Sequence, residues 1–246
     1  MATFLPLKHY MFYLLDQFIE RYSLKGPFLD IGCGVGDVAA YLGSKNWKGK
    51  GIDFSATAVE MARRAVADYP GISIEKIALA DEKSVDYGTI LLWDVIEHIE
   101  DDRSALTLAS SHLASDGMML ISVPSNPREW RWDDEMVGHY RRYTVARMTA
   151  LLHDAGLEPV EFWDFTFPLF WAMRRGYTRL NLNRGKKLDP DLEQRTKASA
   201  IVHTWHIPVI GNLLNRPSSM WRLVYLLQFT FFRHATESWP RVHRAR

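Results

Sequence analysis

Residues 28–37 read FLDIGCGVGD, and this stretch decides the fold of the chain. Gly32, Gly34 and Gly36 follow a short apolar run and precede a sequence that can begin a helix. At a strand–glycine–helix junction of this kind, backbone N–H groups and bare Cα atoms can approach a ligand closely. The phosphate-binding pattern G-x-G-x-x-G would require glycine at position 37, where this chain has Asp37. Because that carboxylate disfavours a pyrophosphate, we expect a cationic or zwitterionic ligand.

The second informative residue is Asp53, which ends the next expected strand about twenty residues beyond the glycines. A carboxylate at this place can accept hydrogen bonds from both hydroxyls of a ribose. The glycines and Asp53 together indicate a nucleoside ligand without a pyrophosphate. The alternative is a tight strand-to-helix turn of a Rossmann-like protein that does not use the turn for binding.

Strand and helix patterns alternate as far as residue 165. The expected strands cover residues 27–31, 50–53, 72–79, 89–95, 118–123 and 159–165, and the expected helices cover residues 10–22, 37–42, 55–67, 104–113 and 144–155. Ser55 is suited to cap the helix expected at residues 55–67. Thr144 is suited to cap the helix expected at residues 144–155, and Gly156 to end it. The alternation predicts an α/β fold with a Rossmann-like, doubly wound and mostly parallel sheet preceded by an N-terminal helix. Catalytic groups are then expected in the loops at the carboxyl ends of the strands.

The chain divides near residue 165 into parts of opposite charge. Residues 1–165, the expected cofactor-binding core, contain 16 Lys and Arg against 25 Asp and Glu, whereas residues 166–246 contain 14 against 4. We expect the second part to be a mainly helical, basic and aromatic lobe, with residues 238–244 as a candidate last strand of the sheet. Such a lobe suits a lid, a packed cap, an oligomer contact or a surface for anionic lipid headgroups.

Composition also limits the location and the partners. Cys33 is the single cysteine, and the N-terminus lacks the pattern of a secretion signal. No apolar run approaches the length of about 18 residues that a membrane span requires. A reducing cytoplasm is the expected location, with contact to the inner face of the membrane as an alternative. The acidic core and the lack of an RNA-binding pattern argue against a nucleic-acid partner, and the oligomeric state is left open.

Three motifs occur in order along the chain: LDIGCGVGD, GIDFS and WDVIEH. Together they resemble the class I S-adenosylmethionine-dependent methyltransferases, in particular the subgroup that contains the ubiquinone-biosynthesis O-methyltransferases. The resemblance covers residues 24–165 and implies S-adenosylmethionine as cofactor, with S-adenosylhomocysteine as its product. It implies cofactor contacts from Asp30, Gly32, Cys33, Gly34 and Gly36 at the methionine end, Asp53 at the ribose, Phe54, Ala80 and Asp81 at the adenine, and Trp93 beside the methionine.

The first stretch with catalytic candidates is DVIEH at residues 94–98, which follows the fourth expected strand. His98 can act there as a general base or orient the acceptor. Asp94, Glu97 and His98 also resemble positions at which some relatives hold a divalent cation. The alternative is that Glu97 and His98 only cap the next helix. We expect no metal, with a divalent cation as the second possibility.

The second stretch is GHYRRY at residues 138–143, similar to a GH-x-RRYT stretch that many of these methyltransferases carry on the substrate side. His139 is the second catalytic candidate. Arginines here can bind an anionic group through charge-assisted hydrogen bonds, or they can pair with the acidic residues 133–135 and merely latch the loop. The residues expected to bind the acceptor are Tyr140, Arg141, Arg142 and Tyr143.

The sequence therefore predicts an S-adenosylmethionine-dependent methyltransferase that acts on oxygen in a small or lipid-linked acceptor with an anionic group. Side-chain chemistry is needed only where the acceptor must lose a proton. The alternative from another class is a non-catalytic nucleotide-binding module that recruits partners or an anionic membrane through its basic C-terminal lobe.

Overall fold

The computed structural model describes residues 6–180, 191, 194–196 and 219–236. Its sheet is built from β1 (Phe28–Ile31), β2 (Gly49–Ile52), β3 (Ile72–Glu75), β4 (Tyr87–Trp93) and β5 (Leu113–Ser122), in the order β3-β2-β1-β4-β5. Each neighbouring pair is parallel. The chain moves outward from β1 in one direction and then returns to continue in the other, which confirms the predicted doubly wound fold.

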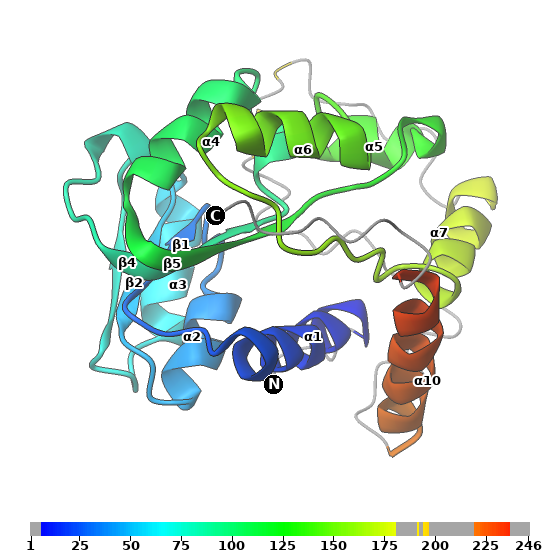
Figure 1. Ribbon diagram of the computed structural model, residues 1–246, viewed down its shortest axis with the longest axis horizontal. Helices are drawn as coiled ribbons and strands as arrows, with labels where there is room; N and C mark the ends of the chain where they lie inside the picture. The colour runs from blue at the N-terminus through cyan, green and yellow to red at the C-terminus, as the bar shows by residue number, and fades with distance from the viewer. Residues whose placement is uncertain (1–5, 181–190, 192–193, 197–218, 237–246) are drawn as a thin grey trace.

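Helices cover both faces of this sheet (Figure 1). One layer holds α1 (Pro6–Tyr22), α2 (Asp37–Ser44) and α3 (Ala56–Ala65), and the other holds α4 (Asp102–Ser111) and α6 (Val145–Asp154). Successive strand side chains point to opposite faces, so Phe28 and Leu91 pack toward the first layer and Leu29, Ile90 and Leu92 toward the second. Burial on both faces explains why these strands are continuously apolar in sequence.

The predicted helix ends are confirmed. The hydroxyl of Ser55 accepts a hydrogen bond from the Ala58 N–H at 3.4 Å, and that of Thr144 accepts one from Arg147 at 3.2 Å. Gly156 follows α6 with a φ of 75°, a left-handed conformation that favours glycine.

Two predicted strands have different lengths in the structure. β3 ends at Glu75 rather than at residue 79, and a short 3-10 helix, η1 (Leu79–Asp81), follows it. β5 begins at Leu113, earlier than the expected residue 118, and its register with β4 is irregular between Tyr87 and Thr89.

The predicted strand at residues 159–165 is wrong, because this segment has no regular secondary structure. Phe162 packs on the core beside the sheet, and the neighbouring Trp163 and Glu161 contact α1. The ring of Trp163 stacks on Phe18 at 4.2 Å between centroids, and Glu161 accepts hydrogen bonds from Tyr22 and, at 3.4 Å, from Arg21. An extended segment that packs aromatic groups on a helix shows the same apolar pattern as a strand, which explains the error.

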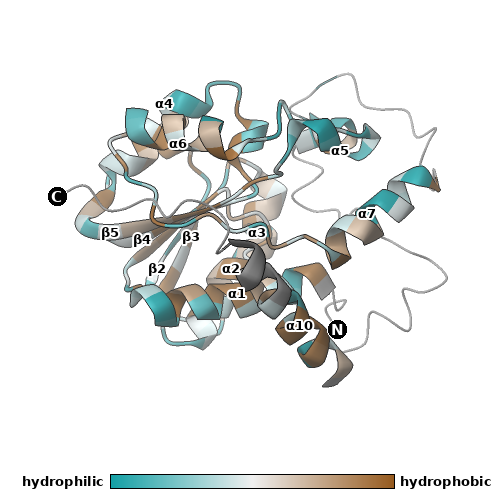
Figure 2. Ribbon diagram, turned by 45° about the vertical axis from the view of Figure 1, so that its right-hand side comes forward, coloured by the Kyte–Doolittle hydropathy of each residue, from teal (hydrophilic) through white to brown (hydrophobic). Residues whose placement is uncertain are grey.

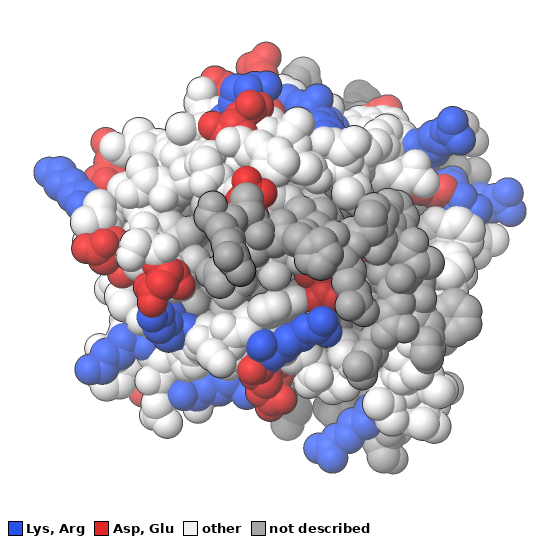
Figure 3. Space-filling view, viewed as in Figure 1, with Lys and Arg blue, Asp and Glu red and all other residues white. Residues whose placement is uncertain are grey.

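The described part of the C-terminal lobe consists mainly of α7 (Leu169–Arg179) and α10 (Ser219–Thr236), which lie away from the sheet (Figure 1). Phe170 of α7 and Tyr225 of α10 pack on Tyr10 of α1, with ring centroids 5.5 and 5.4 Å from that of Tyr10. The candidate last strand at residues 238–244 lies outside the described residues. Among the described helices, none combines the length and apolar character of a transmembrane span. Basic and acidic side chains are interspersed on the face shown in Figure 3.

Candidate functional site

The glycine loop, residues 32–36, connects β1 to α2. Gly32, Gly34 and Gly36 have φ values of 67°, 52° and 81°, which glycine adopts without steric cost. A Cβ on Gly36 would lie 2.8 Å from the Cα of Ala62, and one on Gly32 would lie 2.8 Å from a methyl of Val95. The fold itself therefore requires glycine at two of these positions, whatever the loop binds.

Asp37, directly after this loop, forms an ion pair with Lys8 of α1. Burial lowers the pKa of Lys8 to about 8, and the neighbouring carboxylate is its direct partner. The charge of Asp37 is thus balanced within the protein. The glycine spacing therefore disfavours a pyrophosphate more than this carboxylate does.

Asp53 connects the end of β2 to the glycine loop. One carboxylate oxygen accepts a hydrogen bond from the Gly34 N–H at 3.0 Å, and the other accepts one from Ser55 at 2.7 Å. Burial raises the pKa of Asp53 while these backbone hydrogen bonds oppose the rise. Each carboxylate oxygen has a second lone pair, so Asp53 can still accept hydrogen bonds from a ligand.

Asp30 lies on β1 and is 1% exposed. Its Oδ2 atom has no hydrogen-bond partner in the described part of the chain. Burial and, secondarily, the charge of Asp53 raise the pKa of Asp30 to about 8. Because an unpaired buried carboxyl oxygen is costly, a bound cationic group is a chemically fitting partner for it.

The remaining cofactor candidates lie along the same edge of the sheet. Phe54 follows β2, η1 follows β3, and Trp93 ends β4, so the parallel strands direct all of them to one edge. The ring of Phe54 is 45% exposed, whereas Cys33 is buried and its thiol pKa is raised by burial, so this thiol is not a reactive nucleophile. The two cofactor candidates in η1, Ala80 and Asp81, are exposed.

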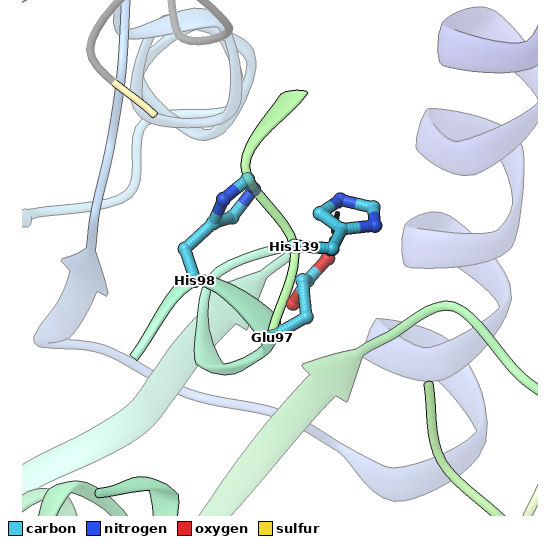
Figure 4. Close-up of side chains that lie close together, drawn as sticks. All are labelled: Glu97, His98 and His139. Atoms are coloured by element: carbon cyan, nitrogen blue, oxygen red, sulfur yellow. Dashed lines mark ion pairs between the residues drawn. The ribbon is translucent and has the colours of Figure 1, made fainter. Parts of the chain in front are cut away.

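The structure brings the two predicted catalytic histidines together (Figure 4). His98 belongs to η2 (Ile96–His98) after β4, and His139 follows α5 (Trp132–Val137). Their ring centroids are 4.7 Å apart. Glu97 lies beside them, with its Oε1 atom 3.9 Å from Nε2 of His139.

The protonation states of these groups differ. Burial, followed by the charge of Asp94, raises the pKa of the fully buried Glu97 well above its ordinary value. Neither Glu97 oxygen has a hydrogen-bond partner among the residues that the structure describes. Burial, followed by the proximity of His139, lowers the pKa of His98 to about 4. Near pH 7, His98 is therefore a neutral imidazole, whereas burial shifts Glu97 toward its protonated form.

His139 is held by a carboxylate. Its Nδ1 atom lies 3.0 Å from Oδ1 of Asp134 in α5. Since burial raises the pKa of Asp134 but hydrogen bonds from His139 and Arg142 outweigh this, the net pKa is low and the carboxylate is ionised. An ionised carboxylate only accepts, so Nδ1 of His139 carries the hydrogen. Sequence reasoning named Asp134 only as a partner for the arginines and missed this contact.

A cation could be held by Glu97, His98 and His139, whose ligand atoms all lie within 4.8 Å of one another. One carboxylate and two imidazoles suit a transition metal better than Mg²⁺, which prefers oxygen ligands. Asp94, the third position considered from sequence, instead accepts a hydrogen bond from the Ser122 hydroxyl at 2.5 Å. These three ligands are thus chemically suitable for a metal, although the set contains His139 in place of Asp94.

Arg141 and Tyr143 hold the loop that carries Glu97 and His98. The guanidinium of Arg141 donates to the carbonyl oxygens of Ile99 and Glu100 at 2.9 and 2.7 Å. The hydroxyl of Tyr143 donates to Asp102 at 2.9 Å, and Arg141 pairs with the same carboxylate at 3.0 Å. These contacts agree with the latch alternative, and acceptor binding by the two residues stays a prediction.

Arg142 also donates hydrogen bonds within the protein. It donates to Asp134 at 2.9 Å and to the carbonyl of Ser125 at 2.8 Å. Tyr140 is 40% exposed, and the Arg141 guanidinium lies 5.5 Å from its ring centroid. Of the four expected acceptor residues, Tyr140 therefore has the most accessible side chain.

Comparison with known proteins agrees with this geometry. A family model described as a methyltransferase domain matches residues 7–161. The ubiquinone biosynthesis O-methyltransferase of Ruegeria sp. (strain TM1040) is 28% identical over 195 residues, covering 69% of this chain and 78% of that protein. The protein of the same name from Alkalilimnicola ehrlichii is 27% identical over 191 residues, covering 73% of each.

Two solved structures share the fold. Magnesium protoporphyrin IX methyltransferase from Synechocystis PCC 6803, with bound SAH, has a TM-score of 0.51 and 20% identity, covering 61% of this chain and 73% of that chain. The cyclase SpnF has a TM-score of 0.50 and 18% identity, covering 58% of this chain and 57% of that chain. Since one of these proteins is described as a cyclase, the shared fold alone does not define the chemistry.

Proposed function

The chain belongs to the methyltransferase family whose model matches residues 7–161, and from that premise we propose that it transfers a methyl group from S-adenosylmethionine to oxygen in a small-molecule acceptor. The observation that carries the proposal is one sheet edge with two chemically distinct ends. The unpaired carboxyl of Asp30 and the glycine loop form one end, and the paired imidazoles of His98 and His139 form the other. The relatives named O-methyltransferases support oxygen as the attacked atom.

We assign the cofactor to the first end. Asp30 would receive the cofactor's ammonium group, which supplies the partner that its Oδ2 atom lacks. Asp53 would hold the ribose hydroxyls, and Phe54 with the η1 residues Ala80 and Asp81 would border the adenine. Trp93 would line the methionine side. The bound cofactor supplies an already activated methyl group, so these residues mainly align it and exclude water.

The second end would remove a proton from the acceptor. His139, with its Nδ1–H fixed on Asp134, can accept a proton at Nε2, the arrangement that orients a general base. His98, with a pKa of about 4, is a weaker base near neutral pH. We therefore assign proton removal to His139 and acceptor orientation to His98.

A cation held by Glu97, His98 and His139 would supply a different route, because it would lower the pKa of an acceptor hydroxyl directly. We propose the route without a metal, in which His139 removes the proton. Turnover should then be unchanged after dialysis against EDTA. Loss of turnover on chelation, with recovery on addition of Mn²⁺ or Zn²⁺, would assign the three side chains to the metal instead.

The anionic group expected on the acceptor would lie near Tyr140 and Arg141. Arg141 has five N–H donors and uses some of them on Ile99, Glu100 and Asp102, so the rest can face a ligand. Methylation of a phenol carrying a carboxylate should accordingly exceed that of the same phenol without it. Equal rates would remove the anionic group from the proposal.

A lipid-linked acceptor would require contact with a membrane surface, and α10 offers a suitable face. Met220, Leu223, Leu226 and Leu227 are each between 50 and 60% exposed, and α10 shows apolar segments along its length (Figure 2). Leu223→Glu should reduce sedimentation with anionic vesicles at low salt, whereas Leu180→Glu, at the end of α7, should not. Absence of sedimentation by the unchanged protein would contradict the membrane contact.

The central test combines binding and turnover. Isothermal titration should detect S-adenosylmethionine and S-adenosylhomocysteine, and mass spectrometry should detect one added methyl group on a hydroxylated acceptor. His139→Gln should lower kcat by about 100-fold or more with the cofactor Kd nearly unchanged. His153→Gln, at an exposed histidine paired with Glu158, is the control and should keep full activity. Cofactor binding without turnover on any acceptor would favour the non-catalytic nucleotide-binding module.

A further inference from the structure

The carboxylate of Asp134 is a junction between two parts of the molecule. Its side chain is 1% exposed. Oδ1 faces Nδ1 of His139 at 3.0 Å and accepts from Nε of Arg142 at 2.9 Å. Oδ2 accepts from the N–H of Arg131 at 2.8 Å and from Arg174 at 2.7 Å. Nη2 of Arg142 also lies 2.9 Å from Oδ1, so the hydrogen-bonding capacity of the two carboxylate oxygens is fully used.

Arg174 brings α7 of the C-terminal lobe to this junction. It forms a two-point contact with Asp133, at 2.8 and 2.6 Å, and also donates to the carbonyl of Glu129 at 3.0 Å. A second link holds the same surfaces together, because the indole N–H of Trp132 donates to the carbonyl of Thr178 at 3.1 Å. One carboxylate of α5 therefore contacts both α7 and His139.

The neighbouring residue Arg175 makes a different contact. It pairs with Glu129, with Nε at 3.1 Å from Oε2, and its guanidinium lies 3.5 Å from the ring centroid of Trp171. Neither of these contacts involves Asp134. Arg174 and Arg175 thus carry the same charge on the same helix, but only Arg174 contacts the carboxylate that binds His139.

We propose that Asp134 is a positioning residue that couples α7 to His139, so that docking of Arg174 on Asp134 fixes the imidazole for proton removal. This inference rests on the proposed function and extends it, because it makes the C-terminal lobe part of the acceptor end of the site. His139 contacts the junction through Nδ1, which leaves Nε2 without a bond to Asp134 and 3.9 Å from Oε1 of Glu97. Without Arg174, Oδ2 keeps only the Arg131 N–H, while Oδ1 keeps Arg142 and His139, so the carboxylate loses one of the contacts that fix its plane relative to the imidazole.

The burial of these groups makes the coupling strong enough to measure. The side chains of Arg174 and Asp133 are 15 and 9% exposed, so solvent screens their contacts less than those of a surface ion pair. Residues that orient a first ligand or base through a hydrogen bond typically change function by about 10- to 100-fold when they are replaced. Arg174→Gln is therefore expected to lower kcat by about tenfold, and Asp134→Asn by about 100-fold, with KM for the cofactor nearly constant.

The test uses the full chain after dialysis against EDTA, and its main readout is the ¹⁵N spectrum of the His139 ring, assigned by its loss in His139→Gln. The unchanged protein should show the Nδ1–H form. Arg174→Gln and Asp134→Asn should show averaging between the two ring tautomers, Arg174→Lys should restore part of the Nδ1–H form, and Arg175→Gln should match the unchanged protein.

Two results would overturn the coupling. One is a His139 spectrum in Arg174→Gln identical to that of the unchanged protein. The other is equal changes in Arg174→Gln and Arg175→Gln, which would indicate general loosening of α7. Because Arg174→Lys keeps the charge, it serves as the second variant if Asp134→Asn does not fold. Altered tautomers without methyl turnover in the unchanged protein would support the coupling and contradict the proposed function, so the two failures are distinguishable.

Discussion

The two ends of the candidate site are built in different ways. At the cofactor end, Asp53 accepts hydrogen bonds from the backbone N–H groups of Gly34 and Ser55, and these three residues lie close together in sequence between β1 and α3. At the histidine end, long side chains from three segments, the stretch at residues 139–143, α6 and α7, converge on Asp102 and Asp134. Substitutions at the first end should therefore act locally on folding and cofactor binding. Those at the second should act through orientation and leave cofactor binding intact.

The largest effect is expected from Gly36→Ala in the glycine loop. Gly36 and Gly156 share left-handed φ values, of 81° and 75°, but an added Cβ would lie 2.8 Å from Ala62 at Gly36 and would meet nothing within 4 Å at Gly156. Left-handed strain costs about 1 kcal/mol in both variants, and overpacking adds about 2–3 kcal/mol at Gly36 alone. Urea unfolding should show this difference. Equal destabilisation of the two variants would show that the loop does not pack tightly on α3.

The next effect concerns cofactor affinity in Asp53→Asn. The amide retains one acceptor oxygen where the carboxylate has two, so it cannot serve the loop N–H, the Ser55 N–H and a ribose together. We expect the Kd for S-adenosylhomocysteine to rise by about 100-fold in isothermal titration, corresponding to about 2.7 kcal/mol. Glu60→Gln, in an exposed ion pair with Arg64 on α3, is the control. Unchanged affinity in Asp53→Asn would remove the ribose assignment.

The same contrast explains what the sequence could and could not predict. The glycine loop, Asp53 and the caps at Ser55 and Thr144 are local in sequence, because backbone conformation and the nearest hydrogen bonds determine them. His98 was recognisable because it follows the fourth expected strand, and His139 because its stretch is similar to one that many of these methyltransferases carry. Their roles and contacts stay predictions until the variants are measured.

The parts that sequence reasoning missed depend on distant pairs. Arg174 and Asp134 lie 40 residues apart, and no periodic pattern connects them. A signal does exist, since the acidic stretch at residues 133–135 is complementary to Arg174 and Arg175, but several basic stretches are equally complementary to it. The false strand at residues 159–165 has a related cause, because Trp163 packs on Phe18 and Arg21 of α1, which are distant in sequence.

A smaller effect is expected from Tyr143→Phe at the histidine end. The change removes the hydroxyl whose single hydrogen is shared between Asp102 at 2.9 Å and the carbonyl oxygen of Ile96 at 3.1 Å. Loss of a buried hydrogen bond to a charged group should cost about 1–2 kcal/mol in urea unfolding. The Kd for S-adenosylhomocysteine should stay constant, and Tyr140→Phe, at an exposed ring, should leave stability unchanged. A weaker Kd in Tyr143→Phe would contradict the separation of the two ends.

The last prediction uses the pH dependence of binding at Asp30. In the free protein its pKa is raised to about 8 by burial and by Asp53, so near pH 7 the carboxyl is mostly protonated. A ligand ammonium at Oδ2 favours the ionised form, so binding must release this proton. Affinity for S-adenosylhomocysteine should therefore rise with pH up to about 8, by at most about tenfold per pH unit. In Asp30→Asn, the pH dependence of this affinity should reflect only the ionisation of the ligand itself.

The stability of the folded free protein should change with pH in the opposite direction, because the carboxyl of Asp30 keeps its proton to higher pH in the folded than in the unfolded chain. As pH rises from the ordinary Asp pKa of 3.8 to about 8, the unfolded state loses this proton first, so the contribution of Asp30 to the stability of the free protein should decline. Bound S-adenosylhomocysteine should offset that decline in urea unfolding, since its ammonium stabilises the ionised carboxylate. An affinity independent of pH, with the same stability slope in Asp30→Asn, would place the ammonium elsewhere and separate Asp30 from the cofactor end.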